Sequence, residues 1–266
     1  MFGSVYTDLL INENIIPIFE VYDDKKTGLC MVVCNNNERS HFTDLGVSTE
    51  ISEKFVNKIW DKIKDCSLIF TELFIIKHQY KILKRLALLG SDKDKIFGFN
   101  LPSFYFLENF LPEILDIYNN ADIVFCNLSE ARFFASQLLF REFDVRELLL
   151  FLASLPKNTK NKNRIIVATN GPEPAYALEY SFQMNDVVEF KEVSCRPIDS
   201  NKVIDTNGAG DSFAGGFLSQ WVQGKSLEDS MICGHWAASL IVQNRGCQIP
   251  YGLEFNIEHA RKDIYG

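Results

Sequence analysis

The chain has 266 residues, 47% of them hydrophobic and 23% charged, so it is long enough to bury a sizeable core and is expected to be globular with one main domain. Its 27 basic residues against 35 acidic residues give a net charge of −8, which argues against a general nucleic-acid or anionic-membrane surface. The seven cysteines are scattered without CxxC pairing or histidine partners, so neither a zinc site nor a disulfide framework is indicated.

The N-terminal part of the chain predicts a small antiparallel sheet. Strands are predicted over residues 15–21, 28–34 and 39–45, and polar turns separate them. Residues 1–14 would precede this sheet as a linker or helix end. No signal-peptide pattern precedes the first predicted strand and no apolar run is long enough to span a bilayer, so a soluble intracellular protein without a membrane partner is expected.

From residue 46 onward, helical and strand patterns alternate, which is the layout of a parallel sheet covered by helices. The predicted helices cover residues 52–63, 79–89, 106–118, 129–139 and 145–155, and two more begin at about residues 209 and 226. The predicted strands cover residues 67–70, 96–101, 123–125, 164–168, 175–180 and 187–193. This divides the chain into a linker (1–14), a small β unit (15–45) and an α/β core (46–266).

The segment from Asp205 to Phe217 predicts a phosphate-handling site. Val203 and Ile204 are expected to end a buried strand, and Gly208 and Gly210 allow a sharp turn and a close approach to a ligand. A helix beginning at about Ala209 would direct its free N–H groups and the positive end of its dipole at a phosphoryl group. A carboxylate beside such an anion site repels the anion, so Asp211 is best explained as a group that takes a proton.

Two better-known phosphate motifs are excluded by the letters of this segment. A dinucleotide fingerprint needs glycine where Phe213 stands, and a Walker A loop needs Lys-Ser/Thr after Gly215, where the chain has Gly216-Phe217. The alternative is purely structural: Asp211 would stabilise the first turn of a helix, and the glycines would be packing contacts.

The segment resembles the signature of the phosphofructokinase-B/ribokinase family of small-molecule kinases, and its flanks are most similar to the adenosine kinases of that family. The similarity runs along nearly the whole chain. Besides Asp205 to Phe217, the residues that carry it are Thr27-Gly28, Glu38-Arg39-Ser40, Asn100-Leu101, Asp122-Ile123-Val124-Phe125 with Asn127 and Glu130, Thr169-Asn170-Gly171, Gly234-His235-Trp236-Ala237-Ala238-Ser239 and Gly246-Cys247.

The resemblance implies an α/β, ribokinase-like fold in which a parallel sheet flanked by helices binds ATP at its carboxyl end and residues 15–45 form most of a small β lid. The implied reaction is the ATP-dependent phosphorylation of adenosine at its 5′-hydroxyl to give AMP, a step of purine salvage, with Mg²⁺ as cofactor. The implied partners are adenosine and ATP, with no nucleic acid, and the family suggests a monomer in the cytoplasm or also the nucleus.

The resemblance also assigns roles to residues. Asp211 would be the base, and Gly208, Ala209 and Gly210 would form the amide-lined anion hole together with the N–H of Asp211. Arg39 would reach the transferring phosphate from the lid. The alternative is that Arg39, in the predicted turn Glu38-Arg39-Ser40, is simply solvated.

On the nucleotide side, Asn127 and Glu130 match an Asn-x-x-Glu that lies near magnesium and the phosphates, mainly through water. The alternative is a helix cap, with Ser129 capping and Glu130 in the first turn. Further positions that match the surroundings of ATP are Thr169, Gly171, Gly208, His235 and Ala238. Taken alone, His235 would be a packed helix histidine.

The sequence departs from the family pattern at its beginning. The family's first strand, its ribose-binding Asp and a Gly-Gly turn are not found, so we expect an N-terminally truncated chain that is poorly stable because sheet neighbours lose their partner. Asp44 stands where the family usually has Asn, and Glu72 where it usually has Gly before an aromatic pair. Glu72 would alter which base is accepted or would face solvent. The alternatives are another ribokinase-like sugar or nucleoside kinase, or a noncatalytic nucleotide-binding remnant.

Overall fold

The computed structural model describes residues 2–35, 38–247 and 252–266. The chain forms two compact units: Met1–Cys66 with Ile75–Leu83, and Ser67–Phe74 with Lys84–Gly266. Over the described residues, every helix is too short or too polar to cross a lipid bilayer.

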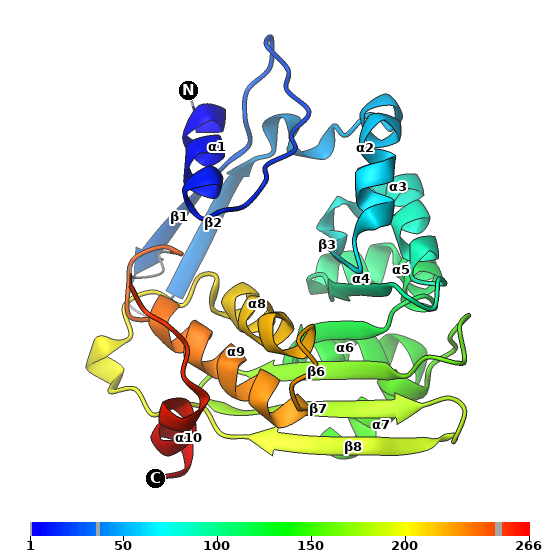
Figure 1. Ribbon diagram of the computed structural model, residues 1–266, viewed down its shortest axis with the longest axis vertical. Helices are drawn as coiled ribbons and strands as arrows, with labels where there is room; N and C mark the ends of the chain where they lie inside the picture. The colour runs from blue at the N-terminus through cyan, green and yellow to red at the C-terminus, as the bar shows by residue number, and fades with distance from the viewer. Residues whose placement is uncertain (1, 36–37, 248–251) are drawn as a thin grey trace. The chain divides into compact units, whose positions relative to one another are not determined.

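The first unit is built from helices and one hairpin (Figure 1). Its elements are α1 (Phe2–Asn12), β1 (Leu29–Asn35), β2 (Glu38–Asp44), a 3-10 helix (Gly46–Thr49), α2 (Glu53–Asp65) and the start of α3 (Ile76–Leu89). β1 and β2 pair antiparallel, with Leu29 opposite Asp44. The strand predicted over residues 15–21 is wrong: this stretch has no regular structure. Pro17 lacks a backbone donor, and none of the strands in the described residues pairs with this stretch.

The second unit contains a six-stranded sheet whose strands are in sequence order. They are β3 (Leu68–Glu72), β4 (Ile96–Asn100), β5 (Ile123–Asn127), β6 (Arg164–Asn170), β7 (Glu173–Ser181) and β8 (Asp186–Val193). The predicted parallel sheet is confirmed from β3 to β6, whereas β7 and β8 are antiparallel, which makes the sheet mixed. The reason is the short turn at Gly171, because so short a connection can join only antiparallel strands.

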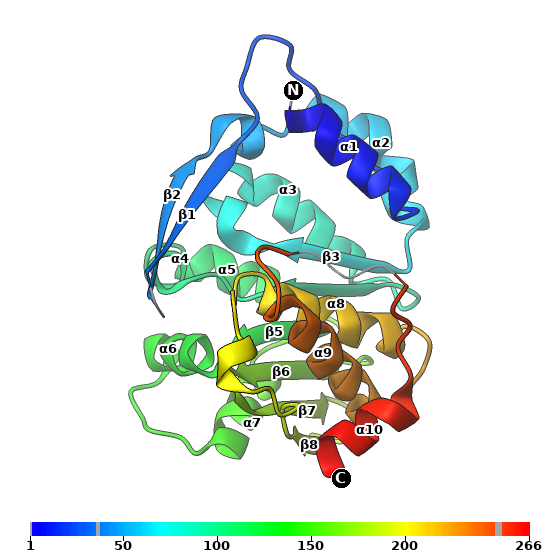
Figure 2. The same cartoon turned by 90° about the vertical axis from the view of Figure 1, so that its left-hand side faces the viewer.

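Helices cover both faces of this sheet (Figure 2). Those that follow the parallel strands are α3, α4 (Phe104–Asn109), α5 (Leu111–Tyr118), α6 (Leu128–Leu138) and α7 (Val145–Ser154). After β8 come α8 (Ala209–Trp221), α9 (Leu227–Ile241) and α10 (Ile257–Tyr265). Right-handed crossovers between sequential strands place α5 to α7 on one face, which leaves the other face to α8, α9 and α10.

Each face has its own apolar layer. On the side of α8 and α9, buried residues of β5 to β8 pack against helix residues such as Phe213, Phe217 and Met231. On the opposite side, the ring of Phe99 contacts Tyr118 edge to face at a centroid distance of 6.0 Å. The sheet is therefore buried on both faces, as parallel strands of an α/β fold require.

Two further predictions need correction, and one helix was missed. The helix predicted over residues 106–118 breaks at Phe110, because the ring of Pro112 clashes with a helical carbonyl four residues earlier. Val203 and Ile204 do not end a buried strand: they lie in a loop, where the two residues are 41% and 56% exposed, and the Ile204 N–H donates to the carbonyl of Val242. The C-terminal helix α10 was not predicted.

Buried charges hold the amino ends of the central strands. Arg164 is fully buried, and its guanidinium donates to backbone carbonyls that include Tyr118 at 3.0 Å and Pro156 at 2.9 Å. Asp122 pairs with Lys157 at 2.8 Å and with Lys162 at 2.7 Å. The hydrogen bonds of these buried charges are satisfied within the protein, so this edge of the sheet has a structural role. The polar side chains that are open to a ligand lie at the opposite edge.

Candidate active site

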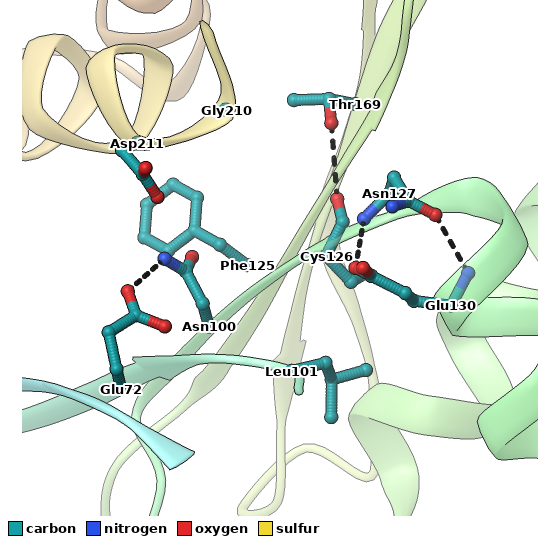
Figure 3. Close-up of a pocket in the computed structure, with 10 residues that line it drawn as sticks. All are labelled: Glu72, Asn100, Leu101, Phe125, Cys126, Asn127, Glu130, Thr169, Gly210 and Asp211. Carbon is teal, nitrogen blue, oxygen red and sulfur yellow. Dashed lines mark hydrogen bonds between the residues drawn. The ribbon is translucent and has the colours of Figure 1, made fainter. Parts of the chain in front are cut away.

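A cavity of about 210 Å³ lies at the carboxyl ends of the parallel strands in the second unit (Figure 3). It is lined by Glu72, Asn100, Leu101, Phe125, Cys126, Asn127, Glu130, Thr169, Gly210 and Asp211. Five of these residues were predicted as site residues: Asn127, Glu130, Thr169, Gly210 and Asp211. A crevice outside the carboxyl ends of parallel strands is the usual place for a ligand in an open α/β sheet.

Strand register brings the polar lining together. Glu72 is opposite Asn100 at the ends of β3 and β4, and Asn127 is opposite Thr169 at the ends of β5 and β6. Each ends a largely apolar strand, so the chain changes from apolar to polar at the point where every strand emerges. The Thr169 hydroxyl donates to the carbonyl of Cys126 at 3.4 Å, which links the third and fourth strand ends.

Helix α8 brings Asp211 to this cavity. The helix begins at Ala209 as predicted, and its N-cap is Gly208 in the left-handed region at φ 74°. Within the described chain, neither the Gly210 nor the Asp211 backbone N–H has a hydrogen-bond acceptor. The exposed carboxylate of Asp211 and two free donors therefore share one helix end, where the dipole favours a bound anion.

The loop before α8 is fixed by Asp205. Its Oδ1 accepts from the backbone N–H and the side-chain amide of Asn207 at 3.0 and 2.7 Å, and its Oδ2 accepts from the Gly246 N–H at 3.1 Å. A Cβ on Gly208 would lie 2.2 Å from the Sγ of Cys247. These contacts hold the start of α8 in one position. Residue 208 must be glycine both because a Cβ would clash with Cys247 and because its φ is in the left-handed region.

Asn127 and Glu130 form a reciprocal cap at the start of α6. The Asn127 Oδ1 accepts from the Glu130 N–H at 2.8 Å, and the Glu130 Oε2 accepts from the Asn127 N–H at 3.0 Å. The cap considered as the alternative is therefore present, although Asn127 rather than Ser129 makes it. Both side chains also line the cavity, so capping and ligand binding are compatible.

This pair fits a hydrated magnesium ion better than a directly bound one. No group of three or more His, Cys, Asp or Glu side chains suited to a metal occurs in the described residues. Mg²⁺ commonly keeps several waters and binds through one or two carboxylates and the phosphates of its substrate. Glu130 retains one carboxylate oxygen outside the cap, and burial raises the pKa of its carboxyl.

Glu72 faces the same cavity from the end of β3. Its Oε1 accepts a hydrogen bond from the side-chain amide of Asn100 (Figure 3). Burial raises the pKa of Glu72 to about 7, the hydrogen bond from Asn100 opposes this, and the charges of Asp211 and Glu130 add to it. The solvent-facing alternative for Glu72 is thus wrong, because the carboxyl group lines the cavity.

Acidic groups dominate the lining. Glu72, Glu130 and Asp211 contribute carboxylates, and none of the cavity residues named above carries a positive charge. Phosphates placed here would be repelled unless cations accompany them. A cation brought by the nucleotide, or by another part of the chain, is therefore needed for phosphate chemistry at this site.

The other predicted site residues are not part of the cavity lining. Gly208 and Ala209 lie at the start of α8 behind Gly210, and Gly171 lies in the turn after β6 at φ 60° with open space around it. Arg39 lies in β2 opposite Cys34, and its side chain is outside the described part of the structure. Ala238 packs beside the apolar layer between sheet and helices.

His235 is a packed histidine in this structure. The residue is 4% exposed, its Nε2–H donates to the Val193 carbonyl at 3.0 Å, and its ring contacts Phe213 of α8 edge to face at a centroid distance of 5.1 Å. Burial lowers the pKa of His235 to about 4, which keeps the ring neutral. His235 therefore supports α8 from behind. Its predicted nucleotide contact stays a prediction.

The sequence did not commit Glu72, Asn100, Leu101, Phe125 or Cys126 to the site, although Glu72 was considered as a residue that alters which base is accepted. The signal for the first two was available, since each is the polar residue that ends an apolar strand. Phe125 and Cys126 belong to a strand that is buried on both faces, and only the register between strands shows that they reach the cavity.

Curated relatives of similar sequence are adenosine kinases. The adenosine kinase of Saccharomyces cerevisiae is 29% identical over 262 residues, which cover 94% of this chain and 73% of the yeast protein. Adenosine kinase 2 of Arabidopsis thaliana is 28% identical over 239 residues, which cover 88% of this chain and 67% of the plant protein.

Solved structures show the same fold. Anopheles gambiae adenosine kinase, crystallised with P1,P4-di(adenosine-5) tetraphosphate, superposes with a TM-score of 0.85 at 22% identity over 94% of this chain and 73% of its own. A probable sugar kinase from Rhizobium etli superposes with a TM-score of 0.78 at 24% identity over 98% of this chain and 73% of its own. The ribokinase-like α/β fold is thereby confirmed. A model of the pfkB family of carbohydrate kinases matches residues 1–252, and the chain belongs to that family.

Proposed function

We propose that the protein phosphorylates adenosine at its 5′-hydroxyl with ATP, giving AMP and ADP. The observation that carries the proposal is the position of Asp211, whose carboxylate faces the cavity beside the free N–H groups that begin α8. The curated adenosine kinases that match most of the chain support adenosine as the acceptor.

In the proposed reaction, the Asp211 carboxylate accepts the proton of the attacking hydroxyl. The hydroxyl oxygen forms a bond to the γ-phosphorus of ATP while the bond from that phosphorus to the bridging oxygen of ADP breaks. Phosphoryl transfer requires little covalent chemistry from a protein, so positioning and charge stabilisation supply most of the catalysis.

The transferring phosphoryl group is proposed to lie against the start of α8. The N–H groups of Gly210 and Asp211 have no acceptor in the described chain, and that of Ala209 makes only a long contact of 3.4 Å to Thr206. Such donors stabilise charge on the equatorial oxygens without reorganising. Arg39, from the β1–β2 hairpin, is proposed to add a cation to the same charge.

The residues proposed to surround the nucleotide are Asn127, Thr169, Gly171, Gly208, His235 and Ala238. Kinases of this kind generally use ATP with a divalent ion, and we propose that Asn127 and Glu130 hold a hydrated Mg²⁺. Bound there, the ion would neutralise phosphate charge. The carboxylate oxygen of Glu130 that lies outside the cap would orient the water molecules around the ion.

A sugar is the competing acceptor, since the family is one of carbohydrate kinases and a probable sugar kinase shares the fold. Both acceptor classes are neutral alcohols, which the acidic lining favours over acceptors that already carry phosphate. An ATP-consumption assay with adenosine, guanosine, inosine, ribose and fructose separates them. We expect adenosine to have the highest kcat/KM. Preference for a sugar would replace the proposal, and turnover of no acceptor would favour the noncatalytic alternative.

A further inference from the structure

Glu72 is held in one orientation in the cavity without using all of its hydrogen-bonding capacity. Its Oε1 accepts from Asn100, which is its register partner on the adjacent strand. The other oxygen, Oε2, has no hydrogen-bond partner among the described residues that line the cavity, and Figure 3 shows the carboxyl group on the cavity side of β3. One oxygen is therefore anchored and the other is open to a ligand.

The surroundings of Glu72 favour a ligand that donates a hydrogen bond. The groups facing it are the Asn100 amide from β4, the Asp211 carboxylate from α8 and the Glu130 carboxylate from α6. The two carboxylates have no proton to donate to Oε2, and the hydrogen bond from the Asn100 amide goes to Oε1. A half-buried carboxylate without a second donor is poorly solvated, so a donor supplied by the substrate would be bound strongly.

We propose that Glu72 determines which acceptor is phosphorylated, by accepting through Oε2 a hydrogen bond from a second donor group of the alcohol, a hydroxyl or an amine. This inference rests on the proposed function, because it concerns the alcohol that Asp211 activates. Adenosine has three candidate donors besides its 5′-hydroxyl: the 2′-hydroxyl, the 3′-hydroxyl and the exocyclic amine. Acceptors with an anionic group at that position would be rejected.

Glu72→Gln is a sharp test of this role. The glutamine oxygen can still accept from Asn100, so the side chain keeps its position, while the open atom changes from an acceptor to a donor. Glu108→Gln is the matched control, because Glu108 is an exposed carboxylate on α4 outside the cavity. Circular dichroism checks that both variants are folded.

The measurement is kcat/KM for adenosine and for three analogues that each lack one donor: 2′-deoxyadenosine, 3′-deoxyadenosine and purine riboside. We expect Glu72→Gln to lower kcat/KM for adenosine about tenfold or more, as the loss of a hydrogen bond to a charged group predicts. For the one analogue that lacks the contacted donor, this penalty should disappear. In the wild-type protein, kcat/KM for that same analogue should be about tenfold lower than kcat/KM for adenosine. This comparison needs no variant.

The pH dependence gives a second reading of the same contact. Because the pKa of Glu72 is about 7, the wild-type KM for adenosine should fall between pH 6 and pH 8 as the carboxylate forms, and the Glu72→Gln profile should be flatter. An equal penalty on all four acceptors, or no penalty on any, would overturn the inference.

Calorimetric titration with the same acceptors separates this inference from the proposed function. Binding of adenosine without turnover, with the same pattern across analogues, would support the contact between Glu72 and adenosine and refute the kinase activity. Turnover of adenosine with the same preference among the analogues in wild type and Glu72→Gln would support the kinase activity and refute the role of Glu72. If adenosine is neither bound nor phosphorylated, both the inference about Glu72 and the proposed function are overturned.

Discussion

The carboxylate of Asp211 is the group on which the proposed chemistry depends. Asp211→Asn keeps the size of the side chain and the backbone N–H but removes the proton acceptor. We expect kcat to fall about 10²- to 10⁴-fold, the usual contribution of a general base, while ATP affinity stays the same. Steady-state kinetics and nucleotide titration measure the two quantities.

The matched control is Asp94→Asn, an exposed carboxylate outside the cavity. That variant should retain wild-type turnover. Near-normal kcat in Asp211→Asn would show that another group takes the proton, and a parallel loss of ATP affinity would assign Asp211 to nucleotide binding instead.

Single residues differed in how far the sequence defined them. Asn127 and Glu130 have capping-box spacing, so their local contact could be predicted, although the capping role was first given to Ser129. For Glu72, the sequence showed only a polar residue at the end of an apolar strand and not its partner. Its side chain faces Asn100 only because β3 and β4 pair in parallel with that register.

At the scale of elements, the start of α8 depends on Gly208. In Gly208→Ala, the left-handed φ of 74° strains the backbone by roughly 1–2 kcal/mol. The new Cβ also meets the Cys247 Sγ at 2.2 Å. We expect a lower free energy of unfolding and a lower kcat, because the donors beside Asp211 move; urea unfolding and kinetics measure these effects.

Two controls separate the strain from the steric clash. Gly224 has a similar φ of 76° with nothing within 4 Å, so Gly224→Ala reports the strain alone. Adding Cys247→Ala to Gly208→Ala leaves the Cys247 Cβ position 3.5 Å away, an ordinary contact, and should recover stability toward the Gly224→Ala level. Equal losses in Gly208→Ala and Gly224→Ala would show that the contact with Cys247 is unimportant.

Most elements of the second unit follow from periodicity and capping residues. Ser226 caps α9 through Asp229, close to the predicted start. Errors arose where an apolar or β-branched run lacked a partner, as at Val203 and Ile204. Whether such a run becomes a strand depends on pairing with a neighbouring strand that is often distant in the sequence.

The stability of the molecule as a whole should depend on His235 in acid. Burial lowers the pKa of His235 to about 4, whereas an unfolded histidine titrates near 6.5. Between these values the unfolded chain binds more protons, so the stabilisation is present above pH 6.5 and is lost as the pH falls toward 4. From pH 7 to pH 5 the contribution lost is about 2 kcal/mol.

Urea unfolding at pH 7 and pH 5 tests this, with His235→Gln as the comparison. Glutamine can still donate to the Val193 carbonyl but does not titrate. Between pH 7 and pH 5, the free energy of unfolding should fall by about 2 kcal/mol more in the wild-type protein than in the variant. Other groups, including Glu72 with its opposite pH dependence, contribute equally to both proteins and cancel. Parallel decreases would mean that His235 is solvated in the folded protein.

The sequence by itself determined the alternation of helices and strands, the glycine turn that begins α8 and the acidic residue beside it, because these depend on local periodicity and backbone conformation. Only the tertiary structure decided that the ends of four parallel strands meet Asp211, that His235 lies behind α8, and that Glu72 is open to the same cavity. The reason is physical: strand register, burial and the field of neighbouring carboxylates arise from contacts between residues distant in the chain.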